Sequence, residues 1–281
     1  MLSPHQQKRY QDDGYLVLPG FKPADEITAL RQRALQIVDN FDADSHRATF
    51  STSDQARRSA GDDFLASAEG IQCFFEEEAF DAQGRLRQAK ALSINKIGHA
   101  LHDLDPVFDR FCRQPALHAL VQGLGLAQPQ LWQSMLIFKQ PGIGGEVKWH
   151  QDASFFDTTP SSVTGLWFAL EDATLDNGCL WVQPGGHRGP LRERFVRHGD
   201  RVQMERLSSQ PWPDTRTAQA LPVAAGSLVC LHGLLPHWSA ANRSAASRMA
   251  FSLHVTDGCA HYADHNWLQR SPTLPVRGFL T

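Results

Sequence analysis

A histidine and an aspartate separated by one residue, His150 and Asp152 in the segment WHQDASFF, offer two metal-binding side chains close together. In a β-strand alternate side chains point to the same face, so we expect both to point one way and Gln151 the other. A second imidazole beside them would complete a site that binds divalent iron and leaves positions open for a co-substrate and oxygen. The sequence therefore predicts a metal site that needs one more histidine from elsewhere.

Other histidines have to be weighed against this pair. With 13 histidines and 21 aspartates in 281 residues, roughly one His-x-Asp is expected by chance, and the chain contains two. The second, His198-Gly199-Asp200, has a glycine at its centre and charged neighbours, which indicate an exposed turn. His99 and His102 resemble a metal pair, but no third ligand follows them, so we assign them no role.

The segment GSLVCLHGLLPHWSAANRSAASRMAFSLHV offers the third ligand, His237, and an arginine, Arg248, that opens a predicted strand. Eleven residues separate the two, enough for a turn at 242–244 and a return on a neighbouring strand. A guanidinium near the metal could grip a carboxylate with two parallel hydrogen bonds. Taken singly, residues such as His150, Asp152 and His237 are more often a surface histidine and a hydrogen-bonded core pair, but their joint occurrence favours a metal site. For Arg248 the alternative is a surface ion pair, and its distance from His237 favours co-substrate binding. His254, on the same strand face as Arg248, could point into the barrel near the substrate, although a hydrogen-bonded core histidine is expected.

The elements that must position these residues change in character along the chain. Residues 14–21 predict a short strand, and a helix is expected from Pro23 to about Asn40. Residues 41–70 are polar and indicate a long surface excursion that could act as a lid, whereas residues 96–125 have helical periodicity. The apolar stripe predicted for the first helix consists of Ile27, Leu30, Ala34 and Ile37.

From about Gln130 onward the chain consists of short apolar runs divided by Gly, Pro and Asn. Such runs predict an antiparallel double sheet of jelly-roll type, with the N-terminal helices packed against one outer face. The six runs are LWQSMLIF, KWHQDASFF, TGLWFALE, CLWVQP, GSLVCLHG and RMAFSLHV.

Length and composition predict one domain over residues 1–281, with a helical part at about 1–128 and a β core at about 129–257. The net charge is -3 and the basic residues are scattered, which argues against a nucleic-acid partner. No apolar stretch is long enough for a membrane span. The five cysteines form no Cys-x-x-Cys pair and are expected to be reduced thiols. These features favour a cytoplasmic protein with a small-molecule partner.

The chain resembles the phytanoyl-CoA dioxygenase family over nearly its whole length. The matching segments are DGYLVLPGF, FSTSDQ, SINKIGHALHDLDPVF, QSMLIFKQPGIGGEV, HQDASF, EDATLDNGCLWVQPGGH, the stretch from His237 to Arg248, and NWLQRSPTLP. The resemblance implies a mainly β fold with flanking helices, the double-stranded β-helix of jelly-roll, cupin-like proteins. It also implies Fe(II) bound by His150, Asp152 and His237.

By the same resemblance, 2-oxoglutarate chelates the iron and Arg248 binds its distal carboxylate. The remaining residues that the resemblance places in the 2-oxoglutarate pocket are Lys96, Met135, Trp167 and Ser239. From the periodicity alone, Lys96 could equally occupy an exposed helix face. Trp238 and the pair Lys148-Trp149 depart from residues common among relatives, which leaves the pocket wall and the substrate open.

The activity implied is an Fe(II)- and 2-oxoglutarate-dependent dioxygenase that uses O2, releases succinate and CO2, and hydroxylates a small molecule or an acyl-type substrate. Two alternatives stay open. A non-catalytic metal- or ligand-binding β-helix protein would keep the fold without turnover, and a zinc hydrolase on the same residues would not require 2-oxoglutarate. The sequence does not specify the substrate, its linkage to CoA or the oligomeric state.

Overall fold

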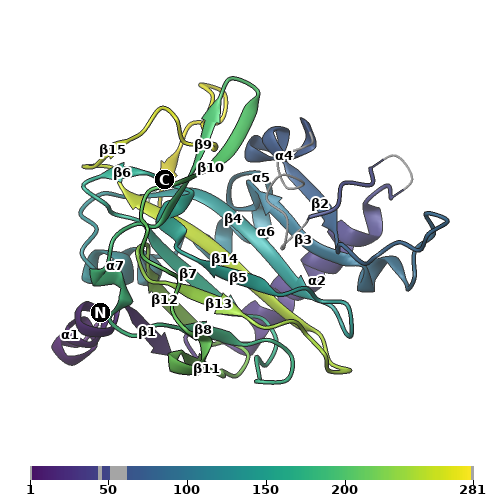
Figure 1. The fold of residues 1–281 in the computed structure, drawn as a ribbon, viewed down its shortest axis with the longest axis horizontal. Helices are drawn as coiled ribbons and strands as arrows, with labels where there is room; N and C mark the ends of the chain where they lie inside the picture. The colour runs from purple at the N-terminus through teal and green to yellow at the C-terminus, as the bar shows by residue number, and fades with distance from the viewer. Residues whose placement is uncertain (1, 44–45, 51–61, 280–281) are drawn as a thin grey trace.

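The computed structural model describes residues 2–43, 46–50 and 62–279. Helices lie mainly before residue 124 and strands dominate thereafter (Figure 1). The helices are α1 Pro4–Asp13, α2 Ala24–Asn40, α4 Asp62–Ala66, α5 Leu101–Leu104, α6 Pro106–Cys112 and α7 Pro115–Gly123. The strands are β1 Tyr15–Leu18, β2 Ile71–Phe75, β3 Ile94–His99, β4 Pro129–Lys139, β5 Val147–His150, β6 Thr158–Thr159, β7 Thr164–Ala169, β8 Leu180–Val182, β9 Glu193–His198, β10 Arg201–Arg206, β11 Gln219–Leu221, β12 Leu228–His232, β13 His237–Ser239, β14 Arg248–Asp257, β15 His261–Tyr262 and β16 Arg277–Gly278.

Two antiparallel sheets form the core of the fold. The larger has eight strands in the order β1-β12-β7-β14-β4-β3-β2, with β16 beside β4, and the smaller has the order β11-β8-β13-β5 (Figure 1). The two sheets face each other, because side chains from both line the same interior cavity. The prediction of a jelly roll, or double-stranded β-helix, is confirmed.

Helices α2, α5, α6 and α7 cover the outer face of the larger sheet, as predicted. The ring of Phe111 in α6 packs 5.1 Å from that of Phe168 in β7 and 5.8 Å from that of Phe251 in β14. Alternation along the strands turns the neighbouring side chains of Trp167 and Ser252 to the interior. Each of these strands therefore packs against helices on one face and lines the interior with the other.

The apolar stripe of α2 agrees with the prediction except at its end. Ile27, Leu30 and Ala34 are buried, but the fourth fully buried residue is Val38 rather than Ile37. Ile37 packs against the core while remaining partly exposed. The buried stripe thus spans eleven residues over three turns, closer to the 3.6 residues per turn of an α-helix than the ten residues of the predicted stripe.

The prediction of helix from residue 96 is wrong at its start, because residues 94–99 form strand β3 and the helices begin at Leu101. All six residues of β3 are buried, so the strand lacks the alternating pattern that would reveal it. Strands β1, β2 and β3 all join the larger sheet, which therefore extends across the expected division at residue 128.

The polar stretch of residues 41–70, expected to be a surface excursion, is partly buried, because Phe64 and Ala68 lie in the interior. Residues 51–61, the centre of the expected lid, lie outside the described residues.

No helix in the described ranges combines the length and the apolar character needed to cross a membrane.

The β9–β10 hairpin turns at Gly199, whose φ of 63° lies in the left-handed region. His198 and Asp200 on either side are exposed, so the second His-x-Asp motif lies in a surface turn, as predicted.

Helix α1 is attached to one end of the barrel by two histidines. His187 Nε2 lies 3.0 Å from the carbonyl oxygen of Gln11, and the backbone N–H of His232 donates to the carbonyl of Gly14. The two imidazole rings pack 4.9 Å apart. Burial, with a smaller contribution from His187, lowers the pKa of His232 to about 4. The imidazole of His232 is therefore uncharged at neutral pH.

We expect acid to destabilise the protein through His232. Its folded pKa of about 4 lies below the ordinary value of 6.5, so the unfolded chain binds the proton first as the pH falls. The stabilisation is complete above about pH 6.5 and declines as the pH falls toward about 4. In the wild type the N–H of Leu234 donates to His232 Nδ1 at 3.1 Å. His232→Asn keeps an acceptor for this N–H and should make the loss of stability in acid smaller. Urea unfolding of both proteins across this pH range tests the prediction, and parallel stability curves would contradict it.

Candidate active site

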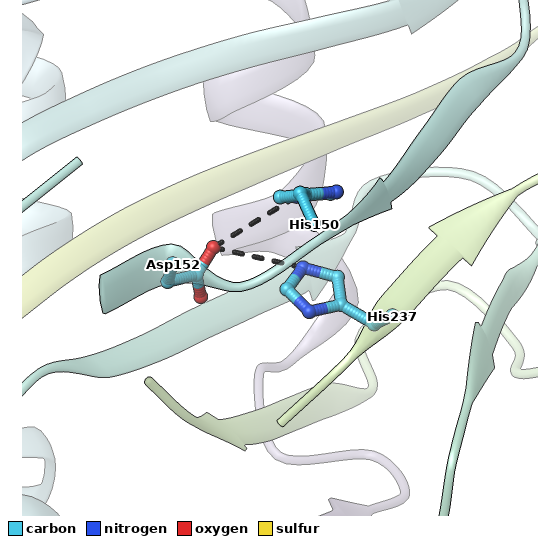
Figure 2. A group of neighbouring side chains, drawn as sticks. All are labelled: His150, Asp152 and His237. Carbon is cyan, nitrogen blue, oxygen red and sulfur yellow. Dashed lines mark ion pairs between the residues drawn. The ribbon is translucent and has the colours of Figure 1, made fainter. Parts of the chain in front are cut away.

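Three side chains predicted as metal ligands meet at one point in the interior (Figure 2). His150 ends β5, His237 begins β13, and the two residues are directly paired across these strands. Asp152 begins the short 3-10 helix η3, Asp152–Ser154. Asp152 Oδ1 lies 3.9 Å from His150 Nε2 and 3.6 Å from His237 Nε2. All three ligand atoms lie within 4.8 Å of one another, close enough to share one ion.

His150 and Asp152 converge as the alternation of an extended chain predicts. Strand β5 ends at His150, but the backbone of Gln151 stays extended, with φ -124° and ψ 133°, so residues 150 and 152 point to the same side. Asp152 itself begins η3, and the N–H of Ala153 holds this turn by donating to the carbonyl of Gly233. The buried side chain of Gln151 points away and donates to the carbonyl of Leu234 at 2.7 Å, as expected.

Both histidines are oriented for metal binding by their own backbone. His150 Nδ1 lies 2.9 Å from the carbonyl oxygen of Lys148, and His237 Nδ1 lies 3.0 Å from that of Leu235. A carbonyl only accepts, so each Nδ1 carries the proton and each Nε2 presents a lone pair. These two lone pairs and the carboxylate of Asp152 face one another. Such a group of acceptors is the donor set that a divalent cation requires.

Burial alone would raise the pKa of Asp152, but the imidazoles of His254 and His237 outweigh that effect and lower it below its usual range. The carboxyl is therefore ionised at neutral pH, as a metal ligand must be.

Arg248 enters the same interior from the larger sheet. It opens β14, whose neighbours are β4 and β7, so it does not lie on a strand beside His237 as the spacing suggested. Instead, Arg248 and His237 face each other across a cavity of about 70 Å³ between the sheets. The side chain of Arg248 is 2% exposed and packs 5.5 Å from the ring of Trp167.

The guanidinium of Arg248 lacks partners that a buried charge needs. Its Nε and Nη1 are buried without a hydrogen-bond partner in the described part of the chain. Burial lowers its pKa to about 10, so it is still a cation at neutral pH. An uncompensated buried cation costs several kcal/mol. The arrangement therefore calls for an anionic ligand in the small cavity, and a carboxylate matches the fork of the guanidinium.

The other residues predicted for this pocket divide between two cavities. Met135, Trp167 and Ser239 line the small cavity together with Arg248. Lys96 borders a larger neighbouring cavity, with its Nζ 3.7 Å from Met135 Sδ and 3.2 Å from the centre of the Phe50 ring. Lys96 is 7% exposed on strand β3, so the alternative of an exposed helix face is wrong.

The larger cavity has a volume of about 640 Å³ and is a suitable size for a small organic molecule. It adjoins the small cavity at the metal-binding group, because His150 and Asp152 line both. Its wall also contains the polar side chain of the buried residue Gln133. The aromatic residues of the wall are Phe50, Phe64, Phe138, Trp149, Phe155, Phe156, Phe195, Trp212 and Trp267.

His254 lies at the site, as the less favoured of the two alternatives from the sequence suggested. It is buried, as a core histidine would be, but it lines both cavities, its Nε2 lies 3.3 Å from Asp152 Oδ1, and its Nδ1 is buried without a described partner. The ring stacks on Phe156 at 5.1 Å. The sequence does contain a signal for this position. Arg248 and His254 lie an even number of residues apart in the same strand, so both side chains are expected to face the interior.

Comparison with known proteins places the chain among proteins of one family. The model of the phytanoyl-CoA dioxygenase (PhyH) family matches residues 10–250. Phytanoyl-CoA dioxygenase 1 of Oryza sativa subsp. japonica is 48% identical, covering 98% of this chain and 97% of that protein. Phytanoyl-CoA dioxygenase domain-containing protein 1 of Bos taurus is 45% identical with the same two coverages.

Among solved structures, the epimerase SnoN in complex with Fe3+, alpha ketoglutarate and nogalamycin RO has a TM-score of 0.65. The similarity covers 98% of this chain and 91% of that chain at 18% sequence identity. At this identity the likeness establishes the shared fold.

Proposed function

The chain belongs to the phytanoyl-CoA dioxygenase family, and from this premise we propose that it is an Fe(II)- and 2-oxoglutarate-dependent dioxygenase that hydroxylates a small apolar or acyl-type molecule. One observation carries the proposal. The two lone-pair-bearing imidazoles and the carboxylate share a small cavity with the buried guanidinium of Arg248, which lacks partners for two of its nitrogens. A metal and a dicarboxylate together supply what this cavity needs.

The donor set fits iron in particular. His150, Asp152 and His237 would hold the ion through two imidazole nitrogens and one carboxylate oxygen, which is the facial arrangement of non-haem Fe(II) oxygenases. With 2-oxoglutarate and O2, the bound iron supplies an oxidant for an unactivated C–H bond while succinate and CO2 are released. The protein orients both histidines and keeps the carboxyl of Asp152 ionised.

The small cavity would receive 2-oxoglutarate. Arg248 would hold its distal carboxylate by a forked, charge-assisted hydrogen bond, and the indole of Trp167 packs against the guanidinium. Met135 and Ser239 would complete the walls.

The larger cavity would bind the substrate. Its aromatic walls favour an apolar body, and the carboxamide of Gln133 would recognise an uncharged hydrogen-bonding group on it. Because this cavity meets the small one at the metal-binding group, the bound molecule would present a C–H bond to the iron while the surrounding rings exclude water.

The direct test is the visible charge-transfer band of the Fe(II)–2-oxoglutarate chelate. We expect the band to develop when 2-oxoglutarate is added to the anaerobic Fe(II)-loaded protein. A zinc hydrolase on the same residues, or a non-catalytic metal-binding protein, would give no such band. Its absence in metal-loaded protein would sink the proposal, whereas its presence would justify screening small molecules for succinate release.

We also propose that the chain acts as one domain in the cytoplasm, without nucleic acid as a partner. The support for this location is that all five cysteines are unpaired, four of them buried, which fits a reducing compartment.

A further inference from the structure

We propose that Gly165 and His254 are positioning residues that hold the Asp152 carboxylate in the orientation needed for metal binding. The inference rests on the proposed function, because it concerns a residue assigned there as an iron ligand. Neither residue belongs to the predicted metal or 2-oxoglutarate sets.

The strand register brings these two residues together. Strand β14 pairs with β7 so that His254 lies directly opposite Gly165. Both line the small cavity, and both lie against Asp152. The larger sheet thus contributes two groups that contact a ligand carried by the segment after β5. These contacts join the ligand to the opposite sheet.

Gly165 provides space for one carboxylate oxygen. A Cβ at this position would lie 2.4 Å from Asp152 Oδ2, much closer than such atoms approach in proteins, and 3.6 Å from Leu231 Cβ. Gly165 lies inside a strand and its φ is not in the left-handed region, so backbone conformation does not explain the glycine. An alanine would have to displace the carboxylate, because the following residue, Ala153, is tied to Gly233 by its backbone.

His254 acts on the other oxygen. If its proton were on Nδ1, a buried N–H would lack a partner and the lone pair of Nε2 would face the carboxylate, which are two unfavourable contacts. The proton therefore belongs on Nε2, which donates to Asp152 Oδ1 at 3.3 Å. Oδ1 is also the oxygen that faces His150 and His237. The stacked ring of Phe156 holds the imidazole in place.

The two contacts together determine how the carboxylate is presented. His254 holds Oδ1 toward the histidine ligands, and the vacancy at Gly165 accommodates Oδ2 on the opposite side. Loss of a group that orients a metal ligand typically costs about 10–100-fold in metal affinity. We expect Gly165→Ala and His254→Phe each to weaken metal binding by about that factor, and His254→Gln, which keeps a donor, to weaken it less.

Co(II) is the probe, because its visible absorption reports both affinity and ligand geometry without turnover. We expect the variants to bind Co(II) more weakly and with an altered spectrum. Gly70→Ala is the matched control, since its backbone is extended and the nearest atom to a new Cβ would be 3.5 Å away. This control should bind Co(II) as the wild type does.

A second measurement separates positioning from general damage to the fold. The unfolding free energy of the metal-free protein is measured for Gly165→Ala, Asp152→Ala and the double variant. If the glycine makes room for the carboxylate, Gly165→Ala should destabilise less in the Asp152→Ala background than in the wild type. An equal effect in both backgrounds would overturn the inference.

The outcomes are distinguishable from failure of the proposed function. A wild type that binds no Co(II) would count against the metal site itself, and the unfolding cycle would still test the Gly165–Asp152 contact. A wild type that binds Co(II), with Gly165→Ala and His254→Phe binding equally tightly, would overturn the positioning role while leaving the metal site intact.

Discussion

Replacing His237 with alanine is expected to reduce the Fe(II) affinity by at least about hundredfold, because even the loss of an outer partner of a ligand costs about 10–100-fold. Asp152→Ala should have an effect of the same size or larger, since it removes the anionic ligand. In both variants the 2-oxoglutarate charge-transfer band should disappear. Anaerobic Fe(II) titration measures the affinity, and the unfolding midpoint of the metal-free protein checks that the fold is kept.

The chain contains a matched control for this experiment. His198→Ala removes the histidine of the second His-x-Asp motif, which lies in the exposed β9–β10 turn. Its Fe(II) affinity and its band should equal those of the wild type. Unchanged binding in His237→Ala and Asp152→Ala would show that the metal is held elsewhere.

Arg248→Met is expected to raise the dissociation constant of 2-oxoglutarate by about thirtyfold or more, since losing one partner of a buried charge pair costs about 2–5 kcal/mol. Fe(II) binding without 2-oxoglutarate should be unchanged. Arg248→Lys keeps the charge but loses the forked geometry, so its affinity should be intermediate. Titration of 2-oxoglutarate into each Fe(II)-loaded variant, followed by the charge-transfer band, gives these constants.

Stability of the ligand-free protein distinguishes this role from a structural one. The guanidinium has buried nitrogens without partners, so methionine should leave the unfolding free energy equal or higher. Arg216→Ala, on an exposed arginine, serves as the control and should not change 2-oxoglutarate binding. If Arg248→Met unfolds more easily while binding 2-oxoglutarate normally, Arg248 has a structural role and another group holds the co-substrate.

The sequence predicted those features that depend on local pattern or on family resemblance. The jelly roll followed from short apolar runs with turns between them, and the resemblance named the three side chains that do converge. Strand β3 was mistaken for helix because burial of both its faces removes the alternation on which the prediction relied. The burial of Phe64 in the polar stretch depends on contacts with distant segments, which composition does not reveal.

The errors at the site have a common physical cause. The roles suggested for His254 and Gly165 depend on which strands pair and in which register. Arg248 was placed on a strand neighbouring that of His237, whereas the two residues lie on opposite sheets. Such relations arise from non-local pairing and cannot be read from spacing alone.

Each histidine of the metal-binding group is oriented by a carbonyl two residues before it in the sequence, that of Lys148 for His150 and that of Leu235 for His237. These two hydrogen bonds are local and use backbone oxygens. Substitutions in the wall of the larger cavity that keep Phe155, Phe156 and His254 can therefore accumulate while the metal-binding group keeps its geometry. A lineage with this architecture is free to diversify in what it oxidises while inheriting the same metal chemistry.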